Sequence, residues 1–212
     1  MNLIKVEGMN DAVNTAIEIY ALGRNHLEAE NIGLTAGRVG EMITKEISNK
    51  FSDTSNKNFF LTDERLNCLE KDKNSILFEN SFNSNGIKKR NNFYTFYNGD
   101  FLDQNGRKFL INEFNLDLCF LSLGEDGHLA GHFENSEDKN DIFSTTSNAP
   151  KSPKDRMSFS LSFLKKTKHI VLCSIGSKKK NITEKFLNGE IFSSDIFVNN
   201  SNRIDVISDF LS

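Results

Sequence analysis

The sequence is poor in cysteine and has no long apolar run. Its 212 residues include three cysteines, Cys68, Cys119 and Cys173, which lie far apart and form no C-x-x-C pair. Cys119 and Cys173 fall inside apolar, strand-like segments, so we expect buried free thiols in a reducing compartment rather than a disulfide framework or a zinc site. No apolar run approaches the length of a membrane-spanning helix, so we expect no association with a membrane.

The sequence also contains little proline, and its net charge is small. The formal net charge is −3, and the two prolines both lie in residues 150–153. A chain with this charge balance is unsuited to binding nucleic acid through a basic surface. The first residues lack the apolar core of a signal peptide. We therefore expect a cytoplasmic protein, monomeric or a small homo-oligomer, that does not bind nucleic acid.

Apolar strand patterns alternate with helical patterns along the chain, and this alternation predicts the fold. We expect one α/β domain over residues 1–212, with a doubly wound, mostly parallel sheet flanked by helices, as in Rossmann-like folds. Hydrophobic residues make up 37% of the chain, which is enough to form a core. Helices are expected at residues 10–29 and 39–47. Strands are expected at residues 31–36, 58–61, 93–97, 116–123, 142–146, 170–176, 195–198 and 203–207.

The stretch 116–128 carries the strongest functional signal. Residues 116–123 are apolar without a turn residue, as expected for a parallel strand buried on both faces. The strand stops at the segment 124–128, GEDGH, whose two glycines permit a sharp turn. Asp126 and His128 thus follow the carboxyl end of a strand, where open α/β sheets bind their ligands.

An aspartate and a histidine on one tight turn indicate acid–base chemistry. Histidine carries protons near neutral pH, and a nearby carboxylate fixes its tautomer and raises its basicity. A glycine-rich turn with one histidine is more often an ordinary loop, which is the alternative interpretation. The buried strand, the two glycines and the acid beside the histidine favour a functional site.

A second strand-to-helix junction lies at residues 35–38, TAGR. A strand, small residues and a helix in this order have the layout of an anion cradle at a helix N-terminus. An ordinary strand-to-helix turn is equally compatible with the pattern.

Residues 121–133, LSLGEDGHLAGHF, resemble the G-x-G-x-D-G-H-x-A-x-x-F signature of the 6-phosphogluconolactonases. That family shares its fold with the glucosamine-6-phosphate deaminase/isomerases. Four more segments match it in order: residues 35–38, the Asp-Glu-Arg of residues 63–65, P-x-x-R ending at Arg156 and G-x-x-K ending at Lys179. In the first of these, an alanine replaces a glycine and an arginine is added. The resemblance covers nearly the whole chain.

By this resemblance, we expect hydrolysis of a phosphosugar lactone without a cofactor or a metal ion. His128 is the expected base that activates water against the lactone carbonyl and later returns the proton to the leaving ring oxygen. Asp126 is expected to orient the site. A single cation is more commonly a solvated surface residue, and only positions after strands favour a binding role. The residues expected to hold the phosphosugar are Arg65, Arg156, Lys179, Gly37, Arg38 and Gly127.

Two other functions stay open. One is an amino-sugar-phosphate isomerase or deaminase, in which Asp63 is the base that moves a proton between carbons. Arg65 and Phe133 argue against it, because the deaminases carry a tyrosine and a catalytic glutamate at these positions. The other is a non-catalytic sugar-phosphate-binding protein, which the altered loop 35–38 and the short segment 79–115 favour.

Overall fold

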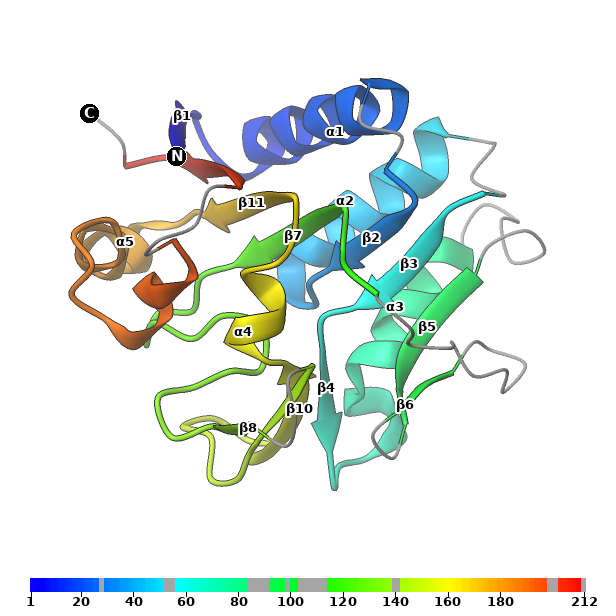
Figure 1. The fold of residues 1–212 in the computed structure, drawn as a ribbon, viewed down its shortest axis with the longest axis vertical. Helices are drawn as coiled ribbons and strands as arrows, with labels where there is room; N and C mark the ends of the chain where they lie inside the picture. Colours follow the sequence, from blue (N-terminus) through cyan, green and yellow to red (C-terminus); the bar gives the residue numbers. More distant parts are fainter. Residues whose placement is uncertain are drawn as a thin grey trace.

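A main sheet, a smaller second sheet and flanking helices make up the fold (Figure 1). The computed structural model describes residues 1–26, 29–51, 56–83, 92–97, 100–102, 114–138, 142–197 and 202–210. The main-sheet strands are β1 (Asn2–Lys5), β2 (Asn31–Leu34), β3 (Asn58–Leu61), β5 (Asn92–Tyr97), β6 (Asp100–Leu102), β7 (Leu118–Ser122), β11 (His169–Ser174) and β12 (Arg203–Ser208). The α-helices are α1 (Met9–His26), α2 (Gly37–Lys50), α3 (Asn74–Asn83), α4 (Leu161–Leu164) and α5 (Lys180–Leu187).

Parallel pairing dominates the main sheet. Within the described residues, the strand order is β1-β12-β11-β7-β2-β3-β5-β6. All neighbours pair in parallel except β5 and β6, which pair antiparallel. The predicted doubly wound, mostly parallel α/β sheet is therefore confirmed.

Helices on both sides of the main sheet explain the unbroken apolar pattern of its central strands. Helices α1, α2 and α3 contribute to one core cluster, and α4 and α5 contribute to another. In β7, Leu118 and Phe120 enter the first cluster, whereas Cys119 and Leu121 enter the second. A strand covered on both faces needs apolar side chains at successive positions. Cys119 and Cys173 are buried free thiols, as predicted.

The chain changes direction between the adjacent strands β2 and β7. From β2 the chain continues through α2 to β3 on one side, and from β7 it continues to β11 on the other. The connections after these two strands therefore diverge. Open α/β sheets bind ligands in the crevice that forms at such a point.

The second sheet is antiparallel and lies outside the sequence-based prediction. Its strands, in spatial order, are β4 (Asp63–Leu66), β10 (Asp155–Phe159), β9 (Phe143–Thr146) and β8 (Glu137–Asp138). The strand predicted at residues 142–146 is β9, whereas residues 63–65 and Arg156 are predicted only to follow strands. They instead pair across β4 and β10, with Arg156 opposite Arg65. Thr62 alone separates β3 from β4, so the chain passes directly from the main sheet into the second.

The strand predicted at residues 195–198 is wrong. The described part of this segment belongs largely to the 3-10 helix η4 (Phe192–Ile196), and Val198 lies outside the described residues. The N–H of Phe197 donates to the carbonyl of Ser194, a bond between residues three apart. Serine and aspartate side chains favour such local turns, and they outweigh the short apolar pattern.

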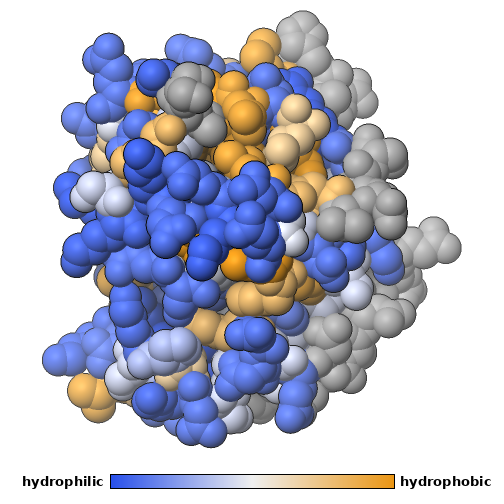
Figure 2. All heavy atoms as spheres, turned by 90° about the vertical axis from the view of Figure 1, so that its left-hand side faces the viewer, coloured by the Kyte–Doolittle hydropathy of each residue, from blue (hydrophilic) through white to orange (hydrophobic). Residues whose placement is uncertain are grey.

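The surface is largely hydrophilic on the side where α5 lies, with scattered apolar patches (Figure 2). The large hydrophobic side chains exposed in the described residues are Met1, Leu3, Leu22 and Leu69. None of the helices in the described ranges combines the length and the apolar character needed to cross a membrane.

Candidate active site

The turn after β7 holds the candidate catalytic histidine in a narrow space. The N–H of Gly124 donates to the His128 carbonyl at 2.8 Å, and the N–H of Gly127 donates to the Gly124 carbonyl at 3.1 Å. A Cβ atom at Gly124 would lie 2.1 Å from Nδ1 of His128, so glycine is needed for the ring to pack there. Gly127 adopts a φ of +85°, which L side chains rarely adopt. The two glycines therefore allow the turn and leave room for the imidazole.

Asp126 and His128 form a hydrogen-bonded pair. Nδ1 of His128 donates to Oδ1 of Asp126, and this bond is the main cause that lowers the pKa of Asp126 to about 2. The imidazole also stacks on Phe133, with ring centroids 4.5 Å apart. Because an ionised carboxylate engages Nδ1, Nε2 is the nitrogen that accepts a proton. The side chains of His128 and Asp126 are 31% and 35% exposed, so water reaches both.

Side chains alternate along β4, so its first three residues have two different roles. Successive strand residues point to opposite faces. Asp63 and Arg65 line the cavity, whereas Glu64 accepts the backbone N–H groups of Asn74 and Ser75. These two N–H groups open α3, where a negative charge is stabilising. The aspartate and the arginine thus serve the site, while the glutamate holds α3 against β4.

Asp63 is a buried carboxyl group in the cavity wall. Burial, and then the charge of Glu64, raises its pKa. The interactions of Asp63 with His128 and Arg156 oppose this shift. The side-chain nitrogen of Asn74 donates to Oδ2 of Asp63 at 2.8 Å and to its backbone carbonyl at 3.1 Å. Asn74 therefore fixes the orientation of the carboxyl group.

Arg156 is a buried cation with unused hydrogen-bonding capacity. Its Nη2 donates to the Lys151 carbonyl at 3.4 Å. Among the described residues, nothing accepts a hydrogen bond from its buried Nη1. Burial lowers the pKa of Arg156, and Asp63 opposes that shift. Arg65, across the strand pair, donates from Nη1 to the Asp72 carbonyl at 3.0 Å. A buried guanidinium nitrogen without an acceptor is a ready donor to an anion.

Lys179 reaches the cavity from the connection after β11. It ends the short 3-10 helix η3 (Ser177–Lys179), which follows Gly176 at a φ of +111°. Its Nζ donates to Oγ of Ser122, at the end of β7, at 3.1 Å. Burial lowers the pKa of Lys179. The neighbouring strand therefore holds this ammonium group at the switch point.

The loop 35–38 brings the start of α2 to the cavity. Ala36 has a φ of −79° and a ψ of −175°, which any residue adopts, whereas Gly37 has a φ of +81°. An alanine at position 36 therefore introduces no backbone strain. A Cβ atom at Gly40 would lie 1.8 Å from the Thr35 carbonyl oxygen, so this glycine permits the close approach of α2 to β2. No described side chain caps α2, and its first N–H groups are available to an anion.

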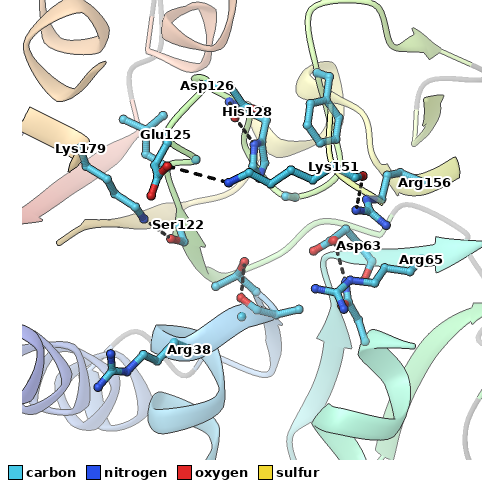
Figure 3. Close-up of a pocket in the computed structure, with 18 of the residues that line it drawn as sticks. Arg38, Asp63, Arg65, Ser122, Glu125, Asp126, His128, Lys151, Arg156 and Lys179 are labelled. Atoms are coloured by element: carbon cyan, nitrogen blue, oxygen red, sulfur yellow. Dashed lines mark hydrogen bonds and ion pairs between the residues drawn. The ribbon is translucent and has the colours of Figure 1, made fainter. Parts of the chain in front are cut away.

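Loops after several strands enclose a cavity of about 370 Å³ (Figure 3). Gly127 is the one predicted site residue that does not line it. A Cβ atom at Gly127 would contact Ile182 and Ile191, and the positive φ of this glycine shapes the turn. The predicted residues that do line the cavity are Gly37, Arg38, Asp63, Arg65, Asp126, His128, Arg156 and Lys179.

Other polar residues of the cavity lie outside the sequence-based prediction. The positions of Ser122 and Asn74 could have indicated a site, because Ser122 ends a buried strand and Asn74 begins a helix beside Asp63. Lys151 lies between the two prolines, and Glu125 lies in the turn 124–128 that carries His128. Apart from Thr35, which belongs to the predicted loop 35–38, the polar residues that the prediction missed are Asn74, Ser122, Glu125, Lys151 and Ser152.

Positive charge exceeds negative charge in the cavity wall. Its cations are Arg38, Arg65, Lys151, Arg156 and Lys179, and its carboxyl groups are those of Asp63, Glu125 and Asp126. This excess favours an anionic ligand. In the part of the chain that the structure describes, no three metal-ligand side chains form a group that could hold an ion.

The family model described as glucosamine-6-phosphate isomerases/6-phosphogluconolactonase matches residues 9–195. The chain therefore belongs to this family, and the resemblance drawn from its motifs is confirmed. No curated protein matches the sequence.

Solved structures of low sequence identity share the fold. A 6-phosphogluconolactonase from Leishmania guyanensis is 16% identical with a TM-score of 0.76, and the match covers 98% of this chain and 95% of that chain. A putative 6-phosphogluconolactonase from Neisseria gonorrhoeae is 18% identical with a TM-score of 0.77, over 98% and 99% of the two chains. A monomeric glucosamine-6-phosphate deaminase is 15% identical with a TM-score of 0.74, over 99% and 98%.

Proposed function

We propose that the protein hydrolyses a phosphosugar lactone in the manner of a 6-phosphogluconolactonase. The observation that carries this proposal is the Asp126–His128 pair, which faces a cation-rich cavity at the switch point of a parallel sheet. A base beside several cations suits a neutral electrophile that carries a phosphate. The similar structures described as 6-phosphogluconolactonases support the same reaction class.

His128 is the general base in this proposal. Its Nε2 removes a proton from water, whose oxygen attacks the lactone carbonyl carbon and forms a tetrahedral intermediate. The bond between that carbon and the ring oxygen then breaks, and the imidazolium returns its proton to the ring oxygen. One water is consumed and an open-chain hydroxy acid is formed. Asp126 keeps Nδ1 as the donor and stabilises the imidazolium.

The phosphate of the substrate binds to Arg65, Arg156 and Lys179 in this proposal. The buried Nη1 of Arg156, for which the described residues offer no acceptor, supports this assignment. The planar guanidinium fork matches two phosphate oxygens at once. The first N–H groups of α2, at Gly37 and Arg38, add donors on the far side of the cavity.

An isomerase or deaminase is the second candidate. Asp63 favours it, because a buried carboxyl group with a raised pKa is suited to move a proton. The similar fold of a glucosamine-6-phosphate deaminase points the same way. Phe133 counts against it, since its ring packs on His128 where resembling deaminases carry a glutamate.

Assays of purified protein on two substrates separate these functions. With 6-phosphogluconolactone, we expect hydrolysis well above the spontaneous rate. With glucosamine 6-phosphate, we expect no release of ammonia. Ammonia release without lactone hydrolysis would establish the deaminase instead. Tight binding of both compounds without turnover would indicate a sugar-phosphate-binding protein.

A further inference from the structure

Lys151 spans the opening of the cavity between two walls. Its backbone carbonyl accepts the hydrogen bond from Nη2 of Arg156, which holds the backbone of Lys151 beside that arginine. Its side chain extends toward the catalytic turn, where Nζ lies 3.8 Å from Oε2 of Glu125 (Figure 3). Glu125 precedes Asp126 and His128 in the same tight turn. The ammonium group therefore lies beside the turn that carries Asp126 and His128, although the backbone of Lys151 lies beside Arg156.

The contact between Lys151 and Glu125 is easily exchanged. Their side chains are 79% and 46% exposed, and exposed ion pairs contribute little free energy. An anion that forms near the catalytic turn therefore competes with Glu125 for the ammonium group at little cost. Lys154, the next lysine on the same loop, is exposed and does not line this cavity.

We propose that Lys151 binds the carbonyl end of the substrate and stabilises the negative charge that forms there. This inference rests on the proposed lactonase function and adds a residue to it. Attack by water moves the carbonyl electron pair onto oxygen, and Nζ of Lys151 donates a hydrogen bond to that oxyanion. When the ring C–O bond breaks, the carbonyl re-forms, and the acid then loses its proton to solvent. Nζ donates to the resulting carboxylate until the product leaves.

Two ligands distinguish the carbonyl end from the phosphate end. The product 6-phosphogluconate carries a carboxylate and a phosphate, whereas glucitol 6-phosphate carries the phosphate alone. Each ligand is titrated into the wild type, Lys151→Met and Arg156→Met, and binding is measured by calorimetry. We expect Lys151→Met to weaken binding of 6-phosphogluconate about tenfold and to leave glucitol 6-phosphate unchanged. Arg156→Met is expected to weaken both ligands.

The kinetic constants give a second readout. Lys151→Met should lower kcat for the lactone by about tenfold to a hundredfold, with little change in KM, because the charge forms only after attack. Lys154→Met is the matched control, with the same charge removed from the same loop. It should change neither the ligand affinities nor the kinetic constants.

Equal weakening of both ligands by Lys151→Met would assign Lys151 to the phosphate and overturn the inference. Unchanged binding and unchanged kcat would overturn it as well. Failure of the proposed function has a different signature, since the wild type would then bind the ligands without opening the lactone. An active wild type with an equally active Lys151→Met variant contradicts only the inference.

Discussion

A histidine pairs with an aspartate near each end of the parallel strands, and the two pairs differ in their surroundings. Near the amino ends, Nε2 of His169 lies 2.9 Å from Oδ2 of Asp205, and the two side chains are 2% and 0% exposed. At the carboxyl ends, His128 and Asp126 remain partly exposed and line the cavity. The same two residue types are therefore sealed at one end of the sheet and accessible at the other.

The neighbouring charges differ in the same way. Nε and Nη2 of Arg203 donate to Oδ2 of Asp205 at 3.1 and 2.9 Å, whereas the buried Oδ1 of Asp205 has no partner in the described residues. At the carboxyl end, Lys179 donates to the hydroxyl group of Ser122, and Nη1 of Arg156 finds no acceptor in the described residues. Access to solvent and a surrounding excess of cations, rather than residue type, thus distinguish the candidate site from a structural cluster.

Replacing each of the two histidines in turn tests this difference, and it is the test with the largest expected effect. His128→Asn should lower kcat for the lactone about 10²–10⁴-fold, the usual contribution of a positioned proton carrier. Its melting temperature should stay close to that of the wild type. His169→Asn should keep kcat and lower the free energy of unfolding by about 1–3 kcal/mol, because Asp205 loses a buried partner. Steady-state kinetics and denaturant unfolding measure both, and equal losses of kcat would abolish the distinction.

Removal of the buried carboxylate should affect stability alone. Asp205→Ala should lower the free energy of unfolding by about 3 kcal/mol, near the low end for a broken buried ion pair, because Arg203 is 57% exposed and turns to solvent. Burial raises the pKa of Asp205, but the hydrogen bonds from Arg203 and His169 outweigh burial and lower it. Its stabilising effect is therefore present above the ordinary aspartate range and is lost on acidification. Urea unfolding at several pH values checks this, and a loss of kcat with unchanged stability would contradict it.

Removal of one arginine from each end should change substrate affinity at one end only. Arg156→Met should raise KM for the lactone about tenfold to a hundredfold, because charge-assisted hydrogen bonds to the phosphate are lost. Arg203→Met removes the same charge at the amino end and should leave KM unchanged. Initial-rate measurements over a range of lactone concentrations give both values. A wild-type KM in Arg156→Met would show that the phosphate binds in another part of the cavity.

The smallest expected effect concerns the pH dependence of stability at Asp126. Its hydrogen bond with His128 lowers the pKa to about 2 in the folded protein, against an ordinary value of 3.8. The stabilising effect of the carboxylate is therefore complete above the ordinary value and disappears as the pH falls through the folded one. Asp126→Asn should lower stability at neutral pH by less than about 1 kcal/mol, since the side chain is partly exposed, and should match the wild type in strong acid. Thermal unfolding across this range is the measurement, and a pH-independent difference would exclude the charge as its cause.

The main sheet was predictable because a strand covered on both faces must be apolar throughout, as in residues 116–123. The turn 124–128 was predictable because glycines beside an acid and a histidine mark a strand end with polar chemistry. The second sheet was not predictable in this way. Its strands β4 and β10 place charged residues such as Asp63 and Arg156 in the cavity wall, and β4, with the sequence DERL, has no apolar period of two.

The missed cavity residues depend on contacts between separate parts of the chain. Asn74 reaches Asp63 across 11 residues, and Lys151 meets Glu125 only because two loops approach one another. Local patterns predict where a strand or helix ends, but they carry little information about which ends meet. Gly127 shows the same limit, since its place in the motif did not reveal that a Cβ atom there would contact Ile182 and Ile191 rather than the cavity.

Under the proposed function, the strand pair β4–β10 also links ligand supply to the stability of the fold. Arg65 and Arg156 lie directly opposite each other, and like charges at such positions repel. Folding therefore brings together two cations that the unfolded chain keeps apart. An anion that binds between them turns this repulsion into attraction and adds stability that grows with the logarithm of its concentration. Heat and proteolysis should thus inactivate the protein fastest when its ligand is depleted, so its working lifetime follows the supply of the compound it binds.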